Sequence, residues 1–248
     1  MPTPFTHLET AQRLLDDIIV PQEIRSALAA ELPAFLLGNI AADARTESGM
    51  KREDTHFYSY DKGIHEHPWR VMLQNHPSLE QTHSAAQRAF LAGYVAHLSI
   101  DEWWSLYMLG PHFALGEWGS RHSRFIMLHV LLIFMDERDL ACLLPWQYET
   151  LIAAQPENWT PFMSDQILSA WRDFIGQQIL PDSSQTLQVL GSRINMTPAD
   201  LRAILDSRDQ MQADLWVNVT PAVLADIEAG MYRHAREQLL VYWTESAG

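Results

Sequence analysis

The chain has 248 residues, of which 47% are hydrophobic and 19% are charged. This length and composition are ordinary for a globular protein with a buried core, and they exclude the disordered, collagen-like and low-complexity classes. Acidic residues outnumber Lys and Arg by 31 to 17, which gives a formal net charge of −14 at pH 7. Such a charge repels phosphate backbones and anionic membrane surfaces, so we expect no nucleic-acid binding.

The cysteine count, the first residues and the apolar stretches together predict a cytoplasmic protein. Cys142 is the one cysteine, which rules out an intramolecular disulfide and suits a reducing compartment. The first residues lack a basic segment followed by an apolar one, so no secretory signal is visible. The longest apolar stretches, such as Phe125–Met135, are too short to span a bilayer. We therefore expect a cytoplasmic protein without stable membrane insertion.

Apolar residues recur at helical spacing from the start of the chain. They predict a first amphipathic helix over Leu8–Ile18, a second from Pro21 to Leu32 and a third over Ala34–Ala42. Residues 44–70 lose this period and are rich in charges and aromatic residues. We predict a long ordered loop there, and long loops in compact domains are often functional.

The rest of the chain is also predicted to be helical. One long helix is expected over Pro77–Leu109, ended by Gly110-Pro111, and another over Ser120–Met135. Further helices are expected to follow four prolines: Pro145, Pro161, Pro198 and Pro221.

These elements favour an all-α fold, a multi-helix bundle without strands or repeats. We expect a single domain over residues 1–248, in which 1–140 supply the helices and loop of a metal site and 141–248 add helices that pack on the core. Leu180–Ser184 is a candidate boundary, but the later helices are too amphipathic to form a detached tail.

The sharpest chemical signal is the pair His97 and Asp101. They lie four residues apart on a predicted helix, so both project from one apolar face. A buried carboxylate must be paired or must bind a cation, and imidazole with carboxylate is a ligand set for Zn²⁺, Mn²⁺ or Fe²⁺. The pair alone also fits a His–Asp contact that merely closes the core.

Three further residues become informative only in combination. His7 lies at the start of the first helix, Asp43 ends the third, and His56 lies in the loop within Thr-His-Phe. Taken singly, each fits an ordinary structural role: a capping residue, a solvated helix-terminal charge and a surface histidine.

The order of these motifs resembles the zinc-dependent phospholipase C family. His7 is followed by Gly38-x-x-x-x-Asp43, then by Thr-His56-Phe, and then by Gly93-Tyr94-x-x-His97-x-x-x-Asp101. The resemblance covers about the first 105 residues, and Gly93-Tyr94 with His97 and Asp101 is its most specific part. That family shares an all-α fold with the zinc-dependent single-strand nucleases.

The resemblance implies roles for these residues. Asp43, His56, His97 and Asp101 would surround one metal ion, and Asp101 would bridge to a second ion that His7 also binds. The resemblance further implies one to three Zn²⁺ ions, with Mn²⁺ or Fe²⁺ as substitutes, and a water that attacks a phosphodiester. Asp43 is then the candidate catalytic base as well as a ligand.

The chain departs from the family pattern in two places. The secreted phospholipases ligate metal through the amino group of an N-terminal tryptophan, whereas six residues without tryptophan precede His7 here. The family also carries a His-x-x-x-Glu cluster downstream of the His-x-x-x-Asp pair, and this chain lacks that cluster there. His122 and His129, seven residues apart on one helix face, are the candidate replacements, and His112 is expected to have no such role.

The remaining histidines are predicted to have ordinary roles. His65 and His67 flank Glu66 in the loop, where exposure to solvent is the favoured interpretation. Glu80 follows His76 at the start of a predicted helix, where an acidic residue in the first turn is common.

Three functions are compatible with the sequence. The first is a metal-dependent hydrolase of a small-molecule or lipid phosphate ester, similar to phospholipase C. The second is a non-catalytic or repurposed member of that fold with a structural metal or a ligand pocket. The third is a helical interaction protein without metal, whose Trp-rich and Met-rich faces form a dimer interface. The sequence leaves the oligomeric state open.

Overall fold

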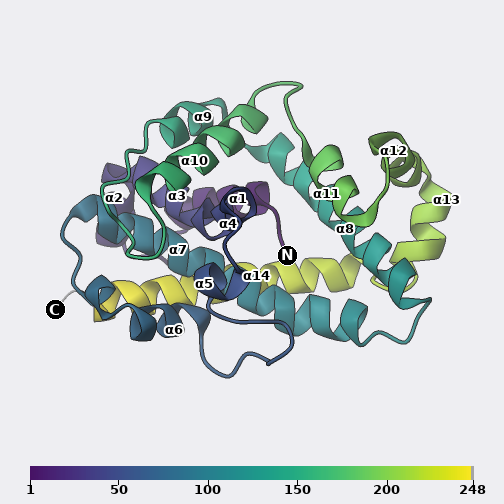
Figure 1. Ribbon diagram of the computed structural model, residues 1–248, viewed down its shortest axis with the longest axis horizontal. Coiled ribbons are helices and arrows are strands. Elements are labelled where there is room, and N and C mark those ends of the chain that lie inside the picture. The colour runs from purple at the N-terminus through teal and green to yellow at the C-terminus, as the bar shows by residue number, and fades with distance from the viewer. Residues whose placement is uncertain (247–248) are drawn as a thin grey trace.

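The computed structural model describes residues 1–246, apart from the side chain of Glu47, and consists of packed helices (Figure 1). That part of the chain contains no strand. The predicted all-α class is therefore confirmed.

The first three predicted helices are present. They are α1 (Pro4–Asp16), α2 (Gln22–Ala30) and α3 (Leu32–Ala41), and α3 continues into a short 3₁₀ turn, η1 (Ala42–Ala44). Every residue of α3 from Ala34 to Ala41 is buried. A helix that is apolar on all sides belongs in the core, and α3 runs through the centre of the fold.

The prediction of one long loop over residues 44–70 is wrong in part. Two short helices, α4 (Arg45–Ser48) and α5 (Arg52–His56), occupy its first half, and α6 (Pro68–Asn75) begins before its end. Helices of four or five residues are too short to show a period, and tertiary contacts must stabilise them. One such contact is the hydroxyl of Tyr94, which donates a 2.7 Å hydrogen bond to the carbonyl of Thr55.

The long central helix is shifted relative to its prediction. The observed helix is α7 (Ala85–Trp104). The hydroxyl of Ser84 caps its N-terminus by accepting a hydrogen bond from the amide of Gln87. Residues Pro77–Glu80 form a separate 3₁₀ turn, η2.

The predicted break at Gly110-Pro111 does not occur. The chain continues from α7 as a π-helix, η3 (Ser105–Ala114), with Pro111 inside it. The amide of Leu115 bonds to the carbonyl of Gly110 at 2.9 Å, five residues back. Such wide turns carry the backbone past the proline, which lacks the amide that an α-helix needs.

The later helices mostly begin where prolines predicted them. They are α8 (Arg121–Cys142), α9 (Pro145–Ile152), α10 (Asp165–Ile179), α11 (Thr186–Ile194), α12 (Pro198–Asp206), α13 (Arg208–Gln210), η4 (Met211–Trp216) and α14 (Pro221–Glu245). The hydroxyls of Thr197 and Thr220 cap α12 and α14. Helix α11 was not predicted.

Buried apolar side chains form one contiguous cluster that extends from Phe5 in α1 to Tyr242 in α14. Its members come from both sides of the candidate boundary at residues 180–184. The cluster agrees with a single domain, which stays a prediction. Among the described residues no single helix is long and apolar enough to cross a membrane. Helix α2 and the segment 32–44, which contains α3, meet the length and hydropathy criteria only when taken together, and the chain bends by 90° between them.

Helices α3 and α7 cross at unusually short distance because glycines lie at the contact. A Cβ atom on Gly93 would lie 2.4 Å from the carbonyl oxygen of Phe35, and one on Gly38 would lie 2.0 Å from that of Phe90. Both are backbone atoms of the opposite helix, so neither can rotate away. Only glycine permits this crossing, which brings the end of α3 beside the middle of α7.

We expect Gly93→Ala to lower the free energy of unfolding by about 1–3 kcal/mol, the usual cost of overpacking a core. Urea denaturation measures the change. Gly176→Ala is the matched control, because its new methyl group meets the side-chain methyl of Ile152 rather than backbone. Equal stability of Gly93→Ala and the wild type would contradict the backbone clash.

A second buried contact involves an ionisable group. The carboxyl of Asp136 in α8 is 2% exposed and accepts a hydrogen bond from the hydroxyl of Thr186 in α11. Burial raises the pKa of Asp136 to about 7. Folding therefore favours the protonated acid, and this contribution is lost as the pH rises from the unfolded pKa of about 4 through 7.

We expect Asp136→Asn to be more stable than the wild type at pH 8, by at most about 4 kcal/mol, since asparagine carries no charge to bury. The difference should shrink steadily towards pH 4. Thermal unfolding at intervals of one pH unit measures it. A difference that is constant with pH, or that grows on acidification, would show that Asp136 is ionised in the folded protein.

Candidate metal centre

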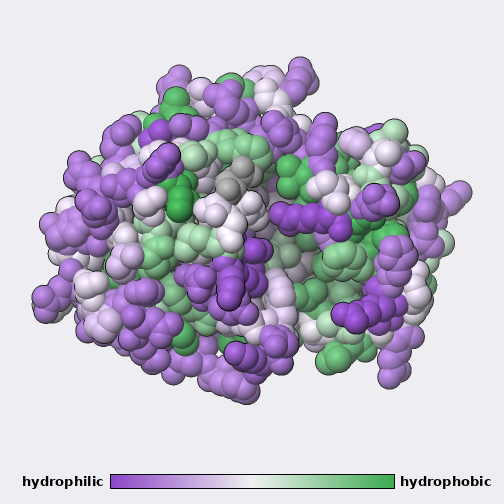
Figure 2. Space-filling model, in the orientation of Figure 1, coloured by the Kyte–Doolittle hydropathy of each residue, from purple (hydrophilic) through white to green (hydrophobic). Residues whose placement is uncertain are grey.

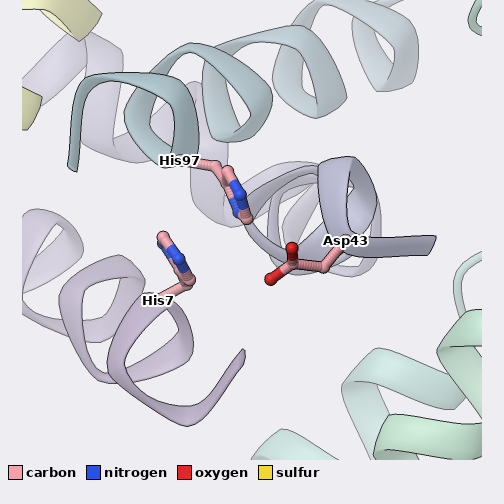
Figure 3. Close-up of side chains that lie close together, drawn as sticks. All are labelled: His7, Asp43 and His97. Carbon is pink, nitrogen blue, oxygen red and sulfur yellow. The ribbon is translucent and has the colours of Figure 1, made fainter. Parts of the chain in front are cut away.

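Five of the seven predicted ligands converge from four separate parts of the chain. His7 comes from α1, Asp43 from η1 after α3, His56 from the end of α5, and His97 and Asp101 from α7. We call these five residues the candidate metal cluster. Figure 3 shows three of them, His7, Asp43 and His97, pointing towards one another.

The distances within the cluster are short. Asp101 lies at its centre: its carboxylate oxygens are 3.2 Å from His56 Nε2, 3.5 Å from His97 Nε2 and 3.7 Å from His7 Nε2. His56 Nε2 is also 3.4 Å from Asp43 Oδ1. The groups that could grip one ion are His7 with Asp43 and His97, and His56 with His97 and Asp101.

The polar atoms facing the centre lack hydrogen-bond partners. His56 Nε2, His97 Nε2 and Asp101 Oδ1 are buried and unpaired, and both ring nitrogens of His7 are unpaired as well. An unsatisfied buried polar group costs about 1–3 kcal/mol, so such a concentration is expensive unless something binds it. A divalent cation would satisfy one nitrogen of each imidazole together with a carboxylate oxygen, and these donors suit Zn²⁺. The residues present therefore fit a zinc centre.

Two of the histidines, His97 and His56, contact other residues through Nδ1, so their Nε2 atoms face the centre. His97 Nδ1 donates to the carbonyl of Asn39 in α3 at 2.7 Å. His56 Nδ1 lies 2.9 Å from the hydroxyl of Thr55. With its proton on Nδ1, His97 keeps the lone pair of Nε2 for a metal, the arrangement common among metal-ligating histidines. His56 does the same when the hydroxyl of Thr55 accepts the proton of its Nδ1.

The motif Gly93-Tyr94-x-x-His97-x-x-x-Asp101 thus has a physical basis at each position. Gly93 allows the crossing that places Asn39 against His97. Tyr94 holds the carbonyl of Thr55, the residue before His56. His97 and Asp101 then face the centre from successive turns of α7.

Electrostatics keeps the carboxylates charged and His7 neutral. Burial opposes ionisation of Asp101, but the nearby imidazoles of His97 and His56 hold its pKa well below the usual range. Burial opposes ionisation of Asp43 in the same way, and His56 and His97 nevertheless lower its pKa. Burial lowers the pKa of His7 to about 3, and the neighbouring His97 adds to the shift. The carboxylates and His7 are therefore in the states that ligate metal. Burial lowers the pKa of His97, but Asp101 raises it above its usual value, so a bound metal would have to displace a proton from this ring.

Sequence reasoning missed Arg52. Its Nη2 lies 3.5 Å from Asp101 Oδ2 and also donates to the hydroxyl of Tyr58, while its Nε and Nη1 atoms are buried without partners. The signal was present, since Arg52 and His56 are four residues apart and share one face of α5.

A cavity of about 1240 Å³ adjoins the cluster. Asp43 is the one member of the cluster on its wall, and its side chain is 13% exposed. Much of the remaining wall is apolar, with Leu128 and Phe125 of α8 and Ile175 of α10. Figure 2 shows the molecule hollowed on this face, with hydrophobic side chains at the hollow. Four arginines also line the cavity: Arg45, Arg52, Arg121 and Arg193.

The two remaining predicted ligands lie apart from the cluster. His122 and His129 are on α8 and line the cavity. His129 Nδ1 lies 2.8 Å from the carbonyl of Phe125, one turn earlier, and burial lowers its pKa. Within the described side chains neither residue joins a group of three ligand-type residues. Their role in metal binding stays a prediction.

Comparison with known proteins supports the resemblance seen in the sequence. The family described as zinc dependent phospholipase C matches residues 6–176, which include the whole candidate metal cluster. A search of the curated proteins found no match, and neither did a search of the solved structures. The matched segment covers well over half of the 248 residues. The chain therefore belongs to the zinc-dependent phospholipase C family.

Proposed function

We propose that the candidate metal cluster holds Zn²⁺ and that the protein hydrolyses a phosphate ester in the adjoining cavity. The observation that carries the proposal is the convergence of five ligand-type side chains, with unpaired atoms at their centre, next to a cavity lined by arginines. When bound there, zinc lowers the pKa of water and neutralises phosphoryl oxygens.

Asp43 is proposed as the general base. It is the cluster member that reaches the cavity, so its carboxylate can accept a proton from water on the cavity side. The lowered pKa of Asp43 keeps its carboxylate ionised at neutral pH. His56 Nε2 lies 3.4 Å from Asp43 Oδ1. The other four members, which are fully buried, hold the centre in place.

The arginines are proposed to bind the phosphoryl group. Arg52 is held by Asp101 and stacks over the rings of Tyr58 and Tyr60, and two of its buried nitrogens, Nε and Nη1, have no hydrogen-bond partner. Arg45 also lines the cavity and has an unpaired Nε. Guanidinium groups suit phosphate oxygens because their planar donors match the anion's geometry. In a chain of net charge −14, this local excess of positive charge favours an anionic substrate.

The apolar wall favours a substrate with hydrocarbon chains. A small soluble ester would leave the ring of Phe125, which is 46% exposed, facing water, whereas an acyl chain would bury it. We therefore propose a lipid phosphodiester as the preferred substrate.

Asp43→Asn is expected to lower kcat by about 100-fold or more, because the amide cannot accept the proton from water. Zinc content should stay near that of the wild type, since four ligands remain. Hydrolysis of a chromogenic phosphodiester and elemental analysis measure the two quantities. Asp54→Asn, which alters an exposed carboxylate on α5, is the matched control and should behave as wild type. Unchanged turnover in Asp43→Asn would remove it as the base.

Substrate chain length tests the apolar wall. With monomeric short-chain phosphatidylcholines, each added methylene that becomes buried should contribute up to about 0.8 kcal/mol, or roughly fourfold in kcat/KM. Phe125→Gln should flatten this dependence, with little effect on a chromogenic phosphodiester that lacks acyl chains. A rate that does not change from butanoyl to hexanoyl esters would argue for a small soluble substrate.

A further inference from the structure

A second cluster of ligand-type side chains joins α7 to α14 and shares no residue with the candidate metal cluster. It consists of His67 before α6, Glu102 in α7 and His234 in α14. His67 Nδ1 is 3.0 Å from both Oε1 and Oε2 of Glu102, and His234 Nε2 is 3.0 Å from Oε2. One ligand atom from each residue lies within 4.8 Å of the other two.

The surroundings of Glu102 favour a bound cation. Its side chain is 7% exposed, and within the described part of the chain both of its ion pairs are with imidazoles. A buried carboxylate needs a compensating positive charge, and a bound divalent cation supplies one. The ring of Trp103 packs 5.4 Å from that of His234 and shields one side of the cluster.

The spacing of the ligand atoms suits a tetrahedral zinc site. Bonds of 2.0–2.1 Å at tetrahedral angles separate neighbouring ligand atoms by about 3.3 Å. The two distances from Glu102 to the imidazoles are 3.0 Å, and the two imidazole nitrogens lie within 4.8 Å of each other. Two histidines and a glutamate form a known three-ligand set for zinc, in which water takes the fourth position. His67 is 35% exposed, so the fourth position is open to solvent. We propose that His67, Glu102 and His234 bind a further Zn²⁺ ion.

This ion would tie together segments far apart in sequence. His67 and His234 are 35 and 132 residues from Glu102. The family match ends at residue 176, so the helix that supplies His234 lies outside it. Figure 1 shows α14 running beside α7, the helix that also carries His97 and Asp101. The bound ion would fix α14 against that helix.

The experiment compares zinc content after saturation and extensive dialysis. The double variant His67→Gln/His234→Gln should hold one zinc ion fewer per chain than the wild type. It should also lose part of the rise in Tm that added Zn²⁺ produces. Its activity should stay within about twofold of the wild type, since neither residue belongs to the candidate metal cluster. His65→Gln, an exposed histidine two residues from His67, is the matched control and should keep the wild-type zinc content.

A second background separates this site from the candidate metal cluster. His7→Gln/His97→Gln should retain one zinc ion, which disappears when the changes at His67 and His234 are added. If the candidate metal cluster binds no zinc, the wild type holds one ion and His67→Gln/His234→Gln holds none, which still supports the site proposed here. Equal zinc content in the wild type and His67→Gln/His234→Gln would overturn it and leave a carboxylate hydrogen-bonded by two imidazoles.

Discussion

The close crossing of α3 and α7 determines where the candidate ligands lie. At Gly93 the two backbones approach within a distance that excludes any side chain. This contact lets the carbonyl of Asn39 accept the Nδ1 proton of His97, and it places Asp43, just beyond the end of α3, against the same centre. A shift of either helix would separate His97 from the carbonyl that orients it, so packing and the proposed metal binding depend on one contact.

Much of the fold and of the cluster could be predicted because both rest on local patterns. The spacing of His97 and Asp101 places them on one helix face wherever the helix lies. The apolar period gives the helices, and prolines mark where several of them begin. The convergence of His7, Asp43 and His56 with this pair, however, came from the family resemblance, since nothing local joins residues so far apart in the chain.

Other features depend on tertiary contacts and left weak traces in the sequence. Helix α5 is five residues long and is held by the bond from Tyr94 to Thr55, so it shows no period. The π-helix keeps Pro111 within a continuous helix, against the usual rule for proline. His67 was expected to be exposed, yet it meets Glu102 and His234 because α14 returns to α7. The cavity takes its walls from several helices, and no single segment encodes it.

The central claim is that the candidate metal cluster jointly binds Zn²⁺. Anomalous diffraction at the zinc absorption edge tests it most directly, because the signal locates the ion among the ligands without reference to activity. The account predicts an anomalous peak about 2.0–2.2 Å from the facing atoms of His56, His97 and Asp101, or of His7, Asp43 and His97. Zinc-saturated crystals with no peak among these five side chains would contradict it.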